Sequence, residues 1–338
     1  MILKRSLAVI GPVLALAALI WGQAALAQAK VELVTVHSPS VEGNLEGNPA
    51  DREVYVVLPP GYDANPGQRY PVVYFLHGIL SKPRNYLDSI DVAEAVEQAA
   101  AAGNPLIVVL PDGYSKHTGS MYSNSPTVGD FESFVAKDVV AYVDANFRTI
   151  ARRESRGLSG HSMGGYGTLR IAMKYPEKFS SIYAMSSCCL PIRPITPQSA
   201  AAANGAPSDG SPIPLPVQLD LAVFAAWSPD PGNPPFYIYT GLKDDGTVDP
   251  LVSARFAANS PIVMVGQHVP ALKRLEAIAL DMGDKDFIGS GSKEFHLELD
   301  RYGIPNSYEE FDGDHGNRLP ERFRSKLLPF FAQHLDRE

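Results

Sequence analysis

Short apolar runs alternate along most of the chain with stretches in which apolar residues recur every three or four positions. The short runs are rich in β-branched and aromatic residues, which is typical of strands covered on both faces. We predict strands at 31–36, 53–58, 72–76, 106–110, 155–158, 179–185, 277–280 and 307–311.

Helices are predicted between these strands. One begins near Asp91, with Glu94 in its first turn as in a capping box, and another follows Asp130. Further helical patterns follow residue 162, surround Phe295 and begin at Pro320. Alternating strands and helices indicate an α/β fold with a mostly parallel central sheet and helices on both faces. The chemistry of such folds lies at the carboxyl ends of the strands.

One segment interrupts this alternation. Residues 191–236 are rich in Pro, Ala, Ser and Gly and contain eleven of the 29 prolines. A long stretch without regular structure inside a domain is usually functional or mobile. We therefore interpret 190–270 as a Pro-rich cap insertion over the active site, with a disordered surface loop as the alternative. Residues 221–227 are apolar enough to dock onto the domain.

The first 27 residues have the three-part layout of a secretory signal peptide. Lys4 and Arg5 precede an apolar run over 7–21, and small residues follow at 25–27. The run is short for a membrane span. We predict cleavage after Ala27, which leaves 28–338 as a single domain that is secreted or periplasmic and has no membrane anchor.

Charge and cysteine content narrow the range of partners. The net charge is −8, and loss of Lys4 and Arg5 would leave 27 basic against 37 acidic residues, or −10. This balance argues against nucleic acid as a partner. The two cysteines, Cys188 and Cys189, are adjacent, so an ordinary disulfide between them would be strained. We expect them to be buried apolar side chains, since a metal site needs more ligands than two.

The centre of the candidate chemistry is the stretch 160–164, Gly-His-Ser-Met-Gly, which matches the G-x-S-x-G nucleophile elbow. In this motif a strand ends in a strained turn that carries the serine, and a helix begins at once. The predicted strand before Ser162 and the helical pattern after it supply this context. The glycines at 160, 164 and 165 leave room for the strand and the helix to approach each other.

A serine hydroxyl needs a base to take its proton and an acid to orient that base. Of the eight histidines, His315 is the best candidate, because it follows the last predicted strand and precedes the final helix. His161 lies inside the elbow, where we expect its side chain to point away from the reaction face of the serine.

The acid is expected after the preceding strand, where 281–286 reads Asp-Met-Gly-Asp-Lys-Asp. Asp281 should still lie in the strand, whereas Asp284 and Asp286 are both within reach of the base. The run 243–246, Lys-Asp-Asp-Gly, is a more distant rival. These residues alone do not separate Asp284 from Asp286.

Catalysis by acyl transfer also needs backbone N–H groups that bind the oxyanion, each worth about 3 kcal/mol of barrier. One is expected from Met163, directly after the nucleophile, and another from Ile79, in the loop after strand 72–76. Gly78 lets that loop turn tightly. Leu80, Tyr122, Asn124 and Trp227 are candidates for the substrate pocket, with ordinary packing as the alternative.

Four motifs together resemble the esterase D-like branch of α/β hydrolases: 75–78 (Phe-Leu-His-Gly), 110–113 (Leu-Pro-Asp-Gly), 160–165 (Gly-His-Ser-Met-Gly-Gly) and 313–315 (Gly-Asp-His). This family includes feruloyl and acetyl-xylan esterases, S-formylglutathione hydrolases and the antigen 85 mycolyltransferases. The resemblance implies that the acid is Asp286, the last Asp of an Asp-x-Gly-x-x-Asp stretch, and that Ile79 supplies the oxyanion donor. The long segment after Cys189 departs from the simpler members.

The sequence therefore predicts a secreted serine carboxylic-ester hydrolase that acts on small acyl or acylated-carbohydrate esters. Ser162 is the expected nucleophile, His315 the base and Asp286 the acid, with no cofactor or metal. Two alternatives remain at this stage: an acyltransferase to a sugar alcohol with the same residues, and a non-catalytic carbohydrate- or surface-binding protein on the same fold.

Overall fold

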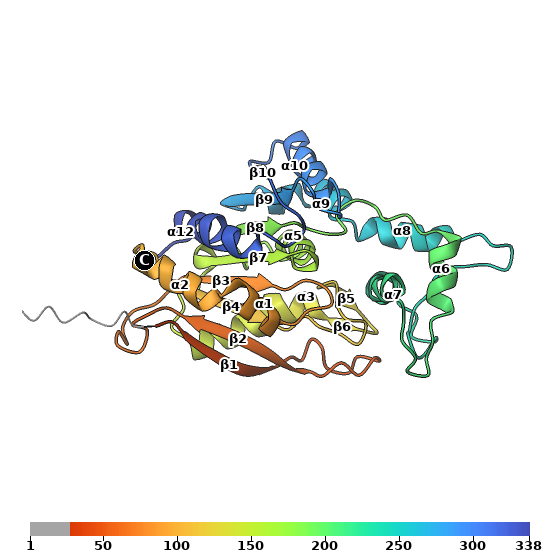
Figure 1. Ribbon diagram of the computed structural model, residues 1–338, viewed down its shortest axis with the longest axis horizontal. Coiled ribbons are helices and arrows are strands. Elements are labelled where there is room, and N and C mark those ends of the chain that lie inside the picture. Colours follow the sequence, from red (N-terminus) through yellow and green to blue (C-terminus); the bar gives the residue numbers. More distant parts are fainter. Residues whose placement is uncertain (1–27) are drawn as a thin grey trace, which may run out of the picture.

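A central sheet of eight strands organises the protein (Figure 1). The computed structural model describes residues 28–338, so the expected signal peptide lies outside the described residues. The strand order is β1-β2-β4-β3-β7-β8-β9-β10. The strands are β1 (Lys30–His37), β2 (Asp51–Leu58), β3 (Val72–Leu76), β4 (Ile107–Pro111), β7 (Arg156–His161), β8 (Ser181–Met185), β9 (Ala277–Gly283) and β10 (Ser307–Phe311), with a separate pair, β5 (Asn124–Ser125) and β6 (Gly129–Asp130).

The strands β4, β3, β7, β8, β9 and β10 pair parallel in that order. β2 pairs antiparallel with β4, and β1 pairs antiparallel with β2 at the edge of the sheet. β3, β4 and β8 are buried along their whole length, as their apolar sequences require. The predicted α/β architecture with a mostly parallel sheet is therefore confirmed.

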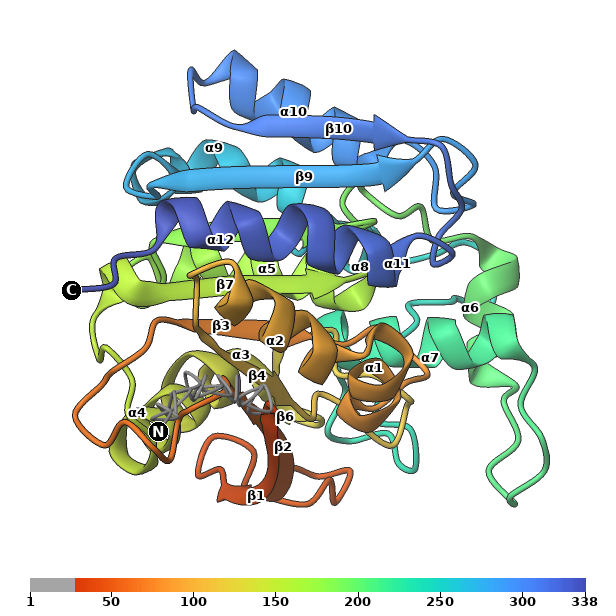
Figure 2. The same ribbon diagram turned by 60° about the vertical axis from the view of Figure 1, so that its left-hand side comes forward.

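Helices cover both faces of the sheet (Figure 2). One face carries α1 (Pro83–Ile90), α2 (Val92–Ala101), α11 (Leu319–Arg322), the π-helical turn η3 (Phe323–Leu327) and α12 (Leu328–His334). The other carries α3 (Phe131–Ser133), the π-helical turn η1 (Phe134–Val139), α4 (Val140–Asn146), α5 (Met163–Lys174), α9 (Pro261–Leu272) and α10 (Gly291–Arg301). A 3₁₀ turn, η2 (Arg153–Ser155), leads into β7. Among residues 28–338, no helix has both the length and the apolar character needed to cross a membrane.

The register of the sheet brings distant parts of the chain to one edge. Leu76 at the end of β3 pairs with Gly160 on β7, and His161 pairs with Met185 on β8. Met185 in turn pairs with Asp281 on β9, whose last residues pair with β10. The loops that follow these five strands therefore leave the sheet side by side at its carboxyl edge.

The Pro-rich insertion is helical, which corrects the expectation of a long stretch without regular structure. It contains α6 (Pro197–Asn204), α7 (Leu215–Trp227), α8 (Pro250–Ala258) and the beginning of α9. Prolines stand in the first turn of all four helices, where the missing N–H group has no intrahelical partner to lose. Figure 2 shows α6 and α7 beyond the carboxyl edge of the sheet.

Residues 221–227 of α7 are buried and join the hydrophobic core, as their apolar character suggested. This helix therefore packs as part of the domain.

Candidate active site

Ser162 lies in the turn between β7 and α5 with φ 58° and ψ −116°, a backbone conformation that residues with a Cβ seldom adopt. Three main-chain hydrogen bonds hold it there: its N–H donates to the carbonyl of Met185 at 3.1 Å, and its carbonyl accepts from the N–H groups of Cys188 at 3.2 Å and Tyr166 at 3.1 Å. At Gly164, any Cβ would collide with the carbonyl of Leu76, so strand and helix can meet this closely only over glycine. The strand, turn and helix of the elbow are present as predicted.

His315 and Asp286 meet across the loops after β10 and β9. Nδ1 of His315 lies 2.8 Å from Oδ2 of Asp286, and the other carboxylate oxygen accepts a hydrogen bond of 2.8 Å from the N–H of Ile288. The Asp286 side chain is fully buried, whereas that of His315 is 19% exposed. Burial pushes the pKa of Asp286 upward, but the hydrogen bonds from His315 and Ile288 outweigh it and leave the pKa below its ordinary value. The carboxylate is therefore ionised and able to orient the imidazole.

The other carboxylates of this region have separate roles. Asp281 lies in β9, as expected, and pairs with Nε of Arg322 at 2.7 Å. Asp284 accepts a hydrogen bond of 2.9 Å from the N–H of Gly313, so it supports the loop that carries His315. In the rival run 243–246, Asp245 accepts hydrogen bonds from the N–H and hydroxyl of Thr247. Of these carboxylates, only Asp286 is hydrogen-bonded to His315.

His315 packs against His161, the residue that precedes the nucleophile. The ring centroids of His161 and His315 are 4.6 Å apart, and His161 directly precedes the serine. Within residues 28–338 the Ser162 hydroxyl and the His315 imidazole form no direct hydrogen bond with each other. In free enzymes such bonds are often long and tighten only when substrate binds.

The side chains of Ile79 and Met163, the two residues predicted to supply the oxyanion donors, lie close to each other. If Gly119 carried a Cβ, that atom would lie 2.6 Å from Sδ of Met163 and 2.8 Å from Cγ1 of Ile79. Both side chains therefore lie against Gly119. In the described part of the chain, neither amide of this pair donates a hydrogen bond to a protein group. The Met163 amide is also the first of α5, where the helix dipole favours a negative charge.

The candidate pocket residues divide into exposed and buried positions. Leu80 is 44% exposed, and its N–H donates to the carbonyl of Thr118 at 3.0 Å. Tyr122 is fully buried and donates its hydroxyl to the carbonyl of His77, whereas Asn124 is exposed on β5. Trp227 is buried, packs against Tyr166 and donates its indole N–H to Ser123. Tyr122 and Trp227 therefore pack in the core, which was the alternative given for both residues.

Two contacts near the site, made by Phe287 and His161, were not predicted from the sequence. Phe287, next to Asp286, is 81% exposed, and its ring centroid lies 4.9 Å from that of His315. His161, which was expected to point away from the reaction face of the serine, has its Nε2 2.6 Å from the main-chain carbonyl oxygen of His315. The sequence carried no signal for this contact beyond the position of His161 beside the nucleophile.

Cys188 and Cys189 are free thiols beside this site. Cys188 is buried, as expected, and Cys189 is partly buried. In the part of the chain that the structure describes, no group of three or more His, Cys, Asp or Glu side chains is arranged to hold a metal ion.

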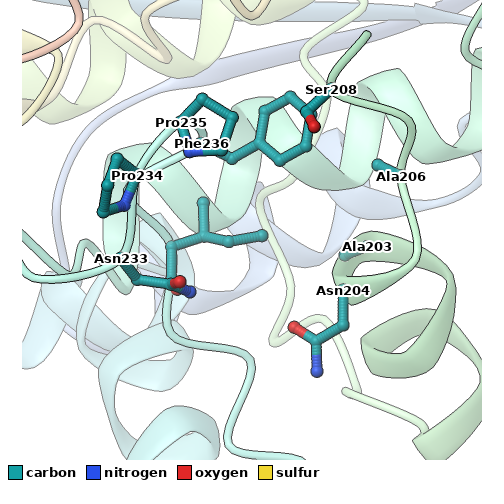
Figure 3. Close-up of a pocket in the computed structure, with 9 residues that line it drawn as sticks. Ala203, Asn204, Ala206, Ser208, Asn233, Pro234, Pro235 and Phe236 are labelled. Atoms are coloured by element: carbon teal, nitrogen blue, oxygen red, sulfur yellow. The ribbon is translucent and has the colours of Figure 1, made fainter.

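A cavity of about 350 Å³ lies within the insertion (Figure 3). It lies between the end of α6 and the loop before Ile238, and its labelled lining includes Asn204, Asn233 and Phe236. Its lining includes none of Ser162, Asp286 and His315, so it is separate from the site described above.

Comparisons with known proteins find similar chains among esterases. The model of the Esterase family matches residues 47–334. An esterase of Mycobacterium tuberculosis is 30% identical over 293 residues, which cover 81% of this chain and 54% of that protein. The S-formylglutathione hydrolase of Paracoccus denitrificans is 30% identical over 43% of this chain and 54% of its own length. The chain thus spans about half the length of these curated relatives.

Solved structures share the fold. A ferulic acid esterase superposes with a TM-score of 0.66 at 21% identity, covering 91% of this chain and 98% of the other. The S-formylglutathione hydrolase from Agrobacterium tumefaciens gives a TM-score of 0.62 at 19% identity over 91% of this chain and 96% of its own.

Proposed function

The chain belongs to the Esterase family, and on that premise we propose that it is a serine carboxylic-ester hydrolase that works through an acyl-enzyme. The observation that carries the proposal is the hydrogen bond between His315 and the buried carboxylate of Asp286, beside a serine in a nucleophile elbow. This arrangement supplies a base and its orienting acid next to a hydroxyl.

In the first half of the reaction Ser162 Oγ attacks the ester carbonyl, and Nε2 of His315 takes the hydroxyl proton. The carbonyl oxygen becomes an oxyanion, which the N–H groups of Ile79 and Met163 bind. Collapse of this intermediate expels the alcohol, which leaves with the proton from His315, and the acyl group remains on Ser162.

Water then repeats the sequence. His315 takes a proton from the attacking water, and the acid is released when the proton returns to Ser162. Throughout, the ionised Asp286 accepts the Nδ1–H of His315, so that Nε2 is free to act as the base and the imidazolium that forms is stabilised.

We further propose that the substrates are small acyl or acylated-carbohydrate esters. The exposed apolar side chains of Leu80 and Phe287, which flank the oxyanion loop and the base, support an apolar or aromatic acyl group. Curated relatives include an acetyl esterase of Caldicellulosiruptor saccharolyticus and an endo-1,4-beta-xylanase/feruloyl esterase of Xylanibacter ruminicola.

The deciding experiment measures hydrolysis of an ester panel from acetyl to feruloyl by the wild-type protein and by Ser162→Ala. We expect the substitution to lower kcat by on the order of 10⁴-fold or more. Ser211→Ala, at an exposed serine of the insertion, is the matched control and should retain full activity. Equal activity of Ser162→Ala and the wild type would refute the proposal.

The same assay distinguishes hydrolysis from acyl transfer. It is repeated with an acceptor alcohol such as a sugar, and the products are quantified. Release of the free acid is expected; partition wholly to the acylated acceptor would make the protein an acyltransferase.

Export from the cytoplasm is a separate proposal, supported by the apolar run before Ala27. Expression of the whole chain in a bacterium, followed by N-terminal sequencing of the protein in each compartment, tests it. Mature protein beginning at residue 28 outside the cytoplasm is expected, and uncleaved protein in the cytoplasm would contradict it.

A further inference from the structure

His161 makes two short hydrogen bonds in the interior. Its Nδ1 lies 2.7 Å from the hydroxyl oxygen of Tyr86, on α1, and its Nε2 lies 2.6 Å from the carbonyl oxygen of His315. The side chain is buried. It therefore joins the helix after the oxyanion loop to the loop that carries the base.

The partners decide where the proton of His161 lies. A carbonyl oxygen can only accept, so Nε2 must carry the hydrogen that is donated to His315. In a neutral imidazole the other nitrogen is then an acceptor, and Nδ1 receives the hydroxyl hydrogen of Tyr86. Burial favours the neutral ring and lowers the pKa of His161 to about 4. Tyr86 and His315 thus specify a neutral His161 ring that carries its proton on Nε2.

The carbonyl that His161 holds belongs to the base itself. His315 lies in a loop without regular secondary structure, between β10 and α11. The other contacts of this loop hold its flanks: Asp284 accepts from Gly313, and Asn317 accepts from Asp314. Without the bond from His161, the main chain of His315 would lose the restraint nearest to its imidazole.

Tyr86 also contacts the opposite side of the site. A Cβ placed on Gly78 would lie 2.6 Å from the Tyr86 hydroxyl and 3.4 Å from Cβ of Ser162. The hydroxyl therefore lies against the oxyanion loop while it donates to His161. The chain of contacts from Gly78 through Tyr86 and His161 to His315 spans both halves of the catalytic apparatus.

We propose that His161 is a positioning residue, which donates through Nε2 to the main chain of His315 and so holds the base within reach of Ser162. The proposal rests on the esterase function proposed above. His161 takes no step in the reaction described above, and its contribution is to the geometry of the proton transfer.

Two substitutions separate the hydrogen bond from the volume of the ring. In His161→Gln the amide nitrogen can occupy the place of Nε2 and still donate to His315. In His161→Asn the shorter amide reaches only the place of Nδ1, so the contact with Tyr86 can persist but the donor to His315 is lost. His296→Asn is the control, since His296 lies on α10 and is hydrogen-bonded to Asn306, outside the site.

We expect His161→Asn to lower kcat for p-nitrophenyl acetate about tenfold or more with little change in KM, because positioning of the base acts on the chemical step. His161→Gln should remain within about threefold of the wild type, and His296→Asn should match it. Melting temperatures of all variants are measured in parallel. An unchanged kcat in His161→Asn, or equal losses in the Asn and Gln variants, would overturn the proposal. Should His161→Asn not fold, a tenfold loss in His161→Gln would overturn it.

A spectroscopic measurement does not depend on activity. Long-range ¹H–¹⁵N correlation spectra of the labelled wild-type protein report which ring nitrogen carries the proton, and His161→Gln assigns the signal. Neutral His161 protonated at Nε2 at pH 7 is expected, and a proton on Nδ1 would overturn the proposal. A wild-type protein that hydrolyses no ester but shows this tautomer would refute the esterase function and leave the hydrogen bond to His315 established.

Discussion

The Oδ2 atom of Asp286 accepts a hydrogen bond of 2.8 Å from Nδ1 of His315, although the two residues belong to different loops after neighbouring strands. The carboxylate of Asp284, two residues earlier, instead accepts a hydrogen bond from the main-chain N–H of Gly313. Asp286 and Asp284, the two candidates for the catalytic acid, therefore have different functions. One orients the base, and the other supports the loop around it.

Asp286→Asn should lower kcat by about 10⁴-fold, because an amide can donate to Nδ1 and so favours the wrong tautomer of the base. Asp284→Asn is the matched control: its Oδ1 can still accept from Gly313, and a loss of less than about fivefold is expected. Steady-state kinetics on p-nitrophenyl acetate measure both. A larger loss in Asp284→Asn than in Asp286→Asn would reverse the assignment.

Stability should depend on pH through His161. Its pKa is about 4 in the folded protein, because burial and the neighbouring His315 disfavour the charged ring, against about 6.5 when unfolded. Below pH 6.5 the unfolded chain takes up a proton that the folded protein does not bind, so stability falls as the pH drops toward 4. The loss from this group is about 2–3 kcal/mol between pH 7 and pH 4.5.

Urea unfolding of the wild type and of His161→Gln at both pH values measures this effect. Glutamine does not titrate, so the variant should lose about 2–3 kcal/mol less than the wild type over the same interval. Equal losses would show that His161 is protonated alike in both states. The Asp286–His315 pair is present in both proteins and cancels in the comparison.

Gly78→Ala should impair catalysis more than folding. The added methyl group would lie 2.6 Å from the Tyr86 hydroxyl and 3.4 Å from Cβ of Ser162, so the oxyanion loop must move. A displaced oxyanion donor costs on the order of 10²-fold in kcat. Gly67→Ala is the control, because nothing lies within 4 Å of its added Cβ. Unaltered kcat in Gly78→Ala would mean that the loop adapts without loss.

Trp227→Ala should destabilise the whole domain. The indole is buried between the rings of Tyr166 and Phe256, and removal of a buried tryptophan costs about 3–5 kcal/mol. Trp227→Phe keeps part of this packing and should cost less. Urea unfolding followed by far-ultraviolet circular dichroism gives both values. A Trp227→Ala protein as stable as the wild type would show that α7 is an independent lid.

Phe287→Ala should raise KM for aromatic esters about fivefold, as expected from the loss of about 1 kcal/mol of contact, with kcat unchanged. The ring is exposed beside His315, so its removal leaves no cavity in the core. Leu297→Ala, at an exposed leucine of α10, is the control. An equal change in KM for acetyl and feruloyl esters in Phe287→Ala would contradict a contact between Phe287 and an aromatic acyl group.

Periodicity identified the elements that are governed by burial. β3, which is buried along its whole length, begins and ends at the predicted residues. The helices of the insertion were not predicted because the segment is rich in Pro, Ala, Ser and Gly, although a proline in a first turn is compatible with each helix. α1 was missed too, although it also has a proline in its first turn.

Part of the site could also be predicted from the sequence. Chain order and the strand ends indicated Ser162 and His315, because parallel strands bring their following loops to one edge. The choice between Asp284 and Asp286 depends on how the loop 284–286 turns toward Gly313, and linear order does not contain that turn. His161 depends on the path of a loop more than 150 residues away, as its partner His315 shows.

The long insertion connects β8 to β9, two strands that pair directly with each other in the sheet. An insertion at this point does not alter the pairing of β8 with β9. The positions of Ser162, His315 and Asp286 relative to the sheet are therefore preserved as well. Exchange of this connection between related proteins would therefore replace α6, α7 and α8 while Ser162, His315 and Asp286 keep their places on the sheet. The insertion and the chemical step can thus diverge independently in this architecture.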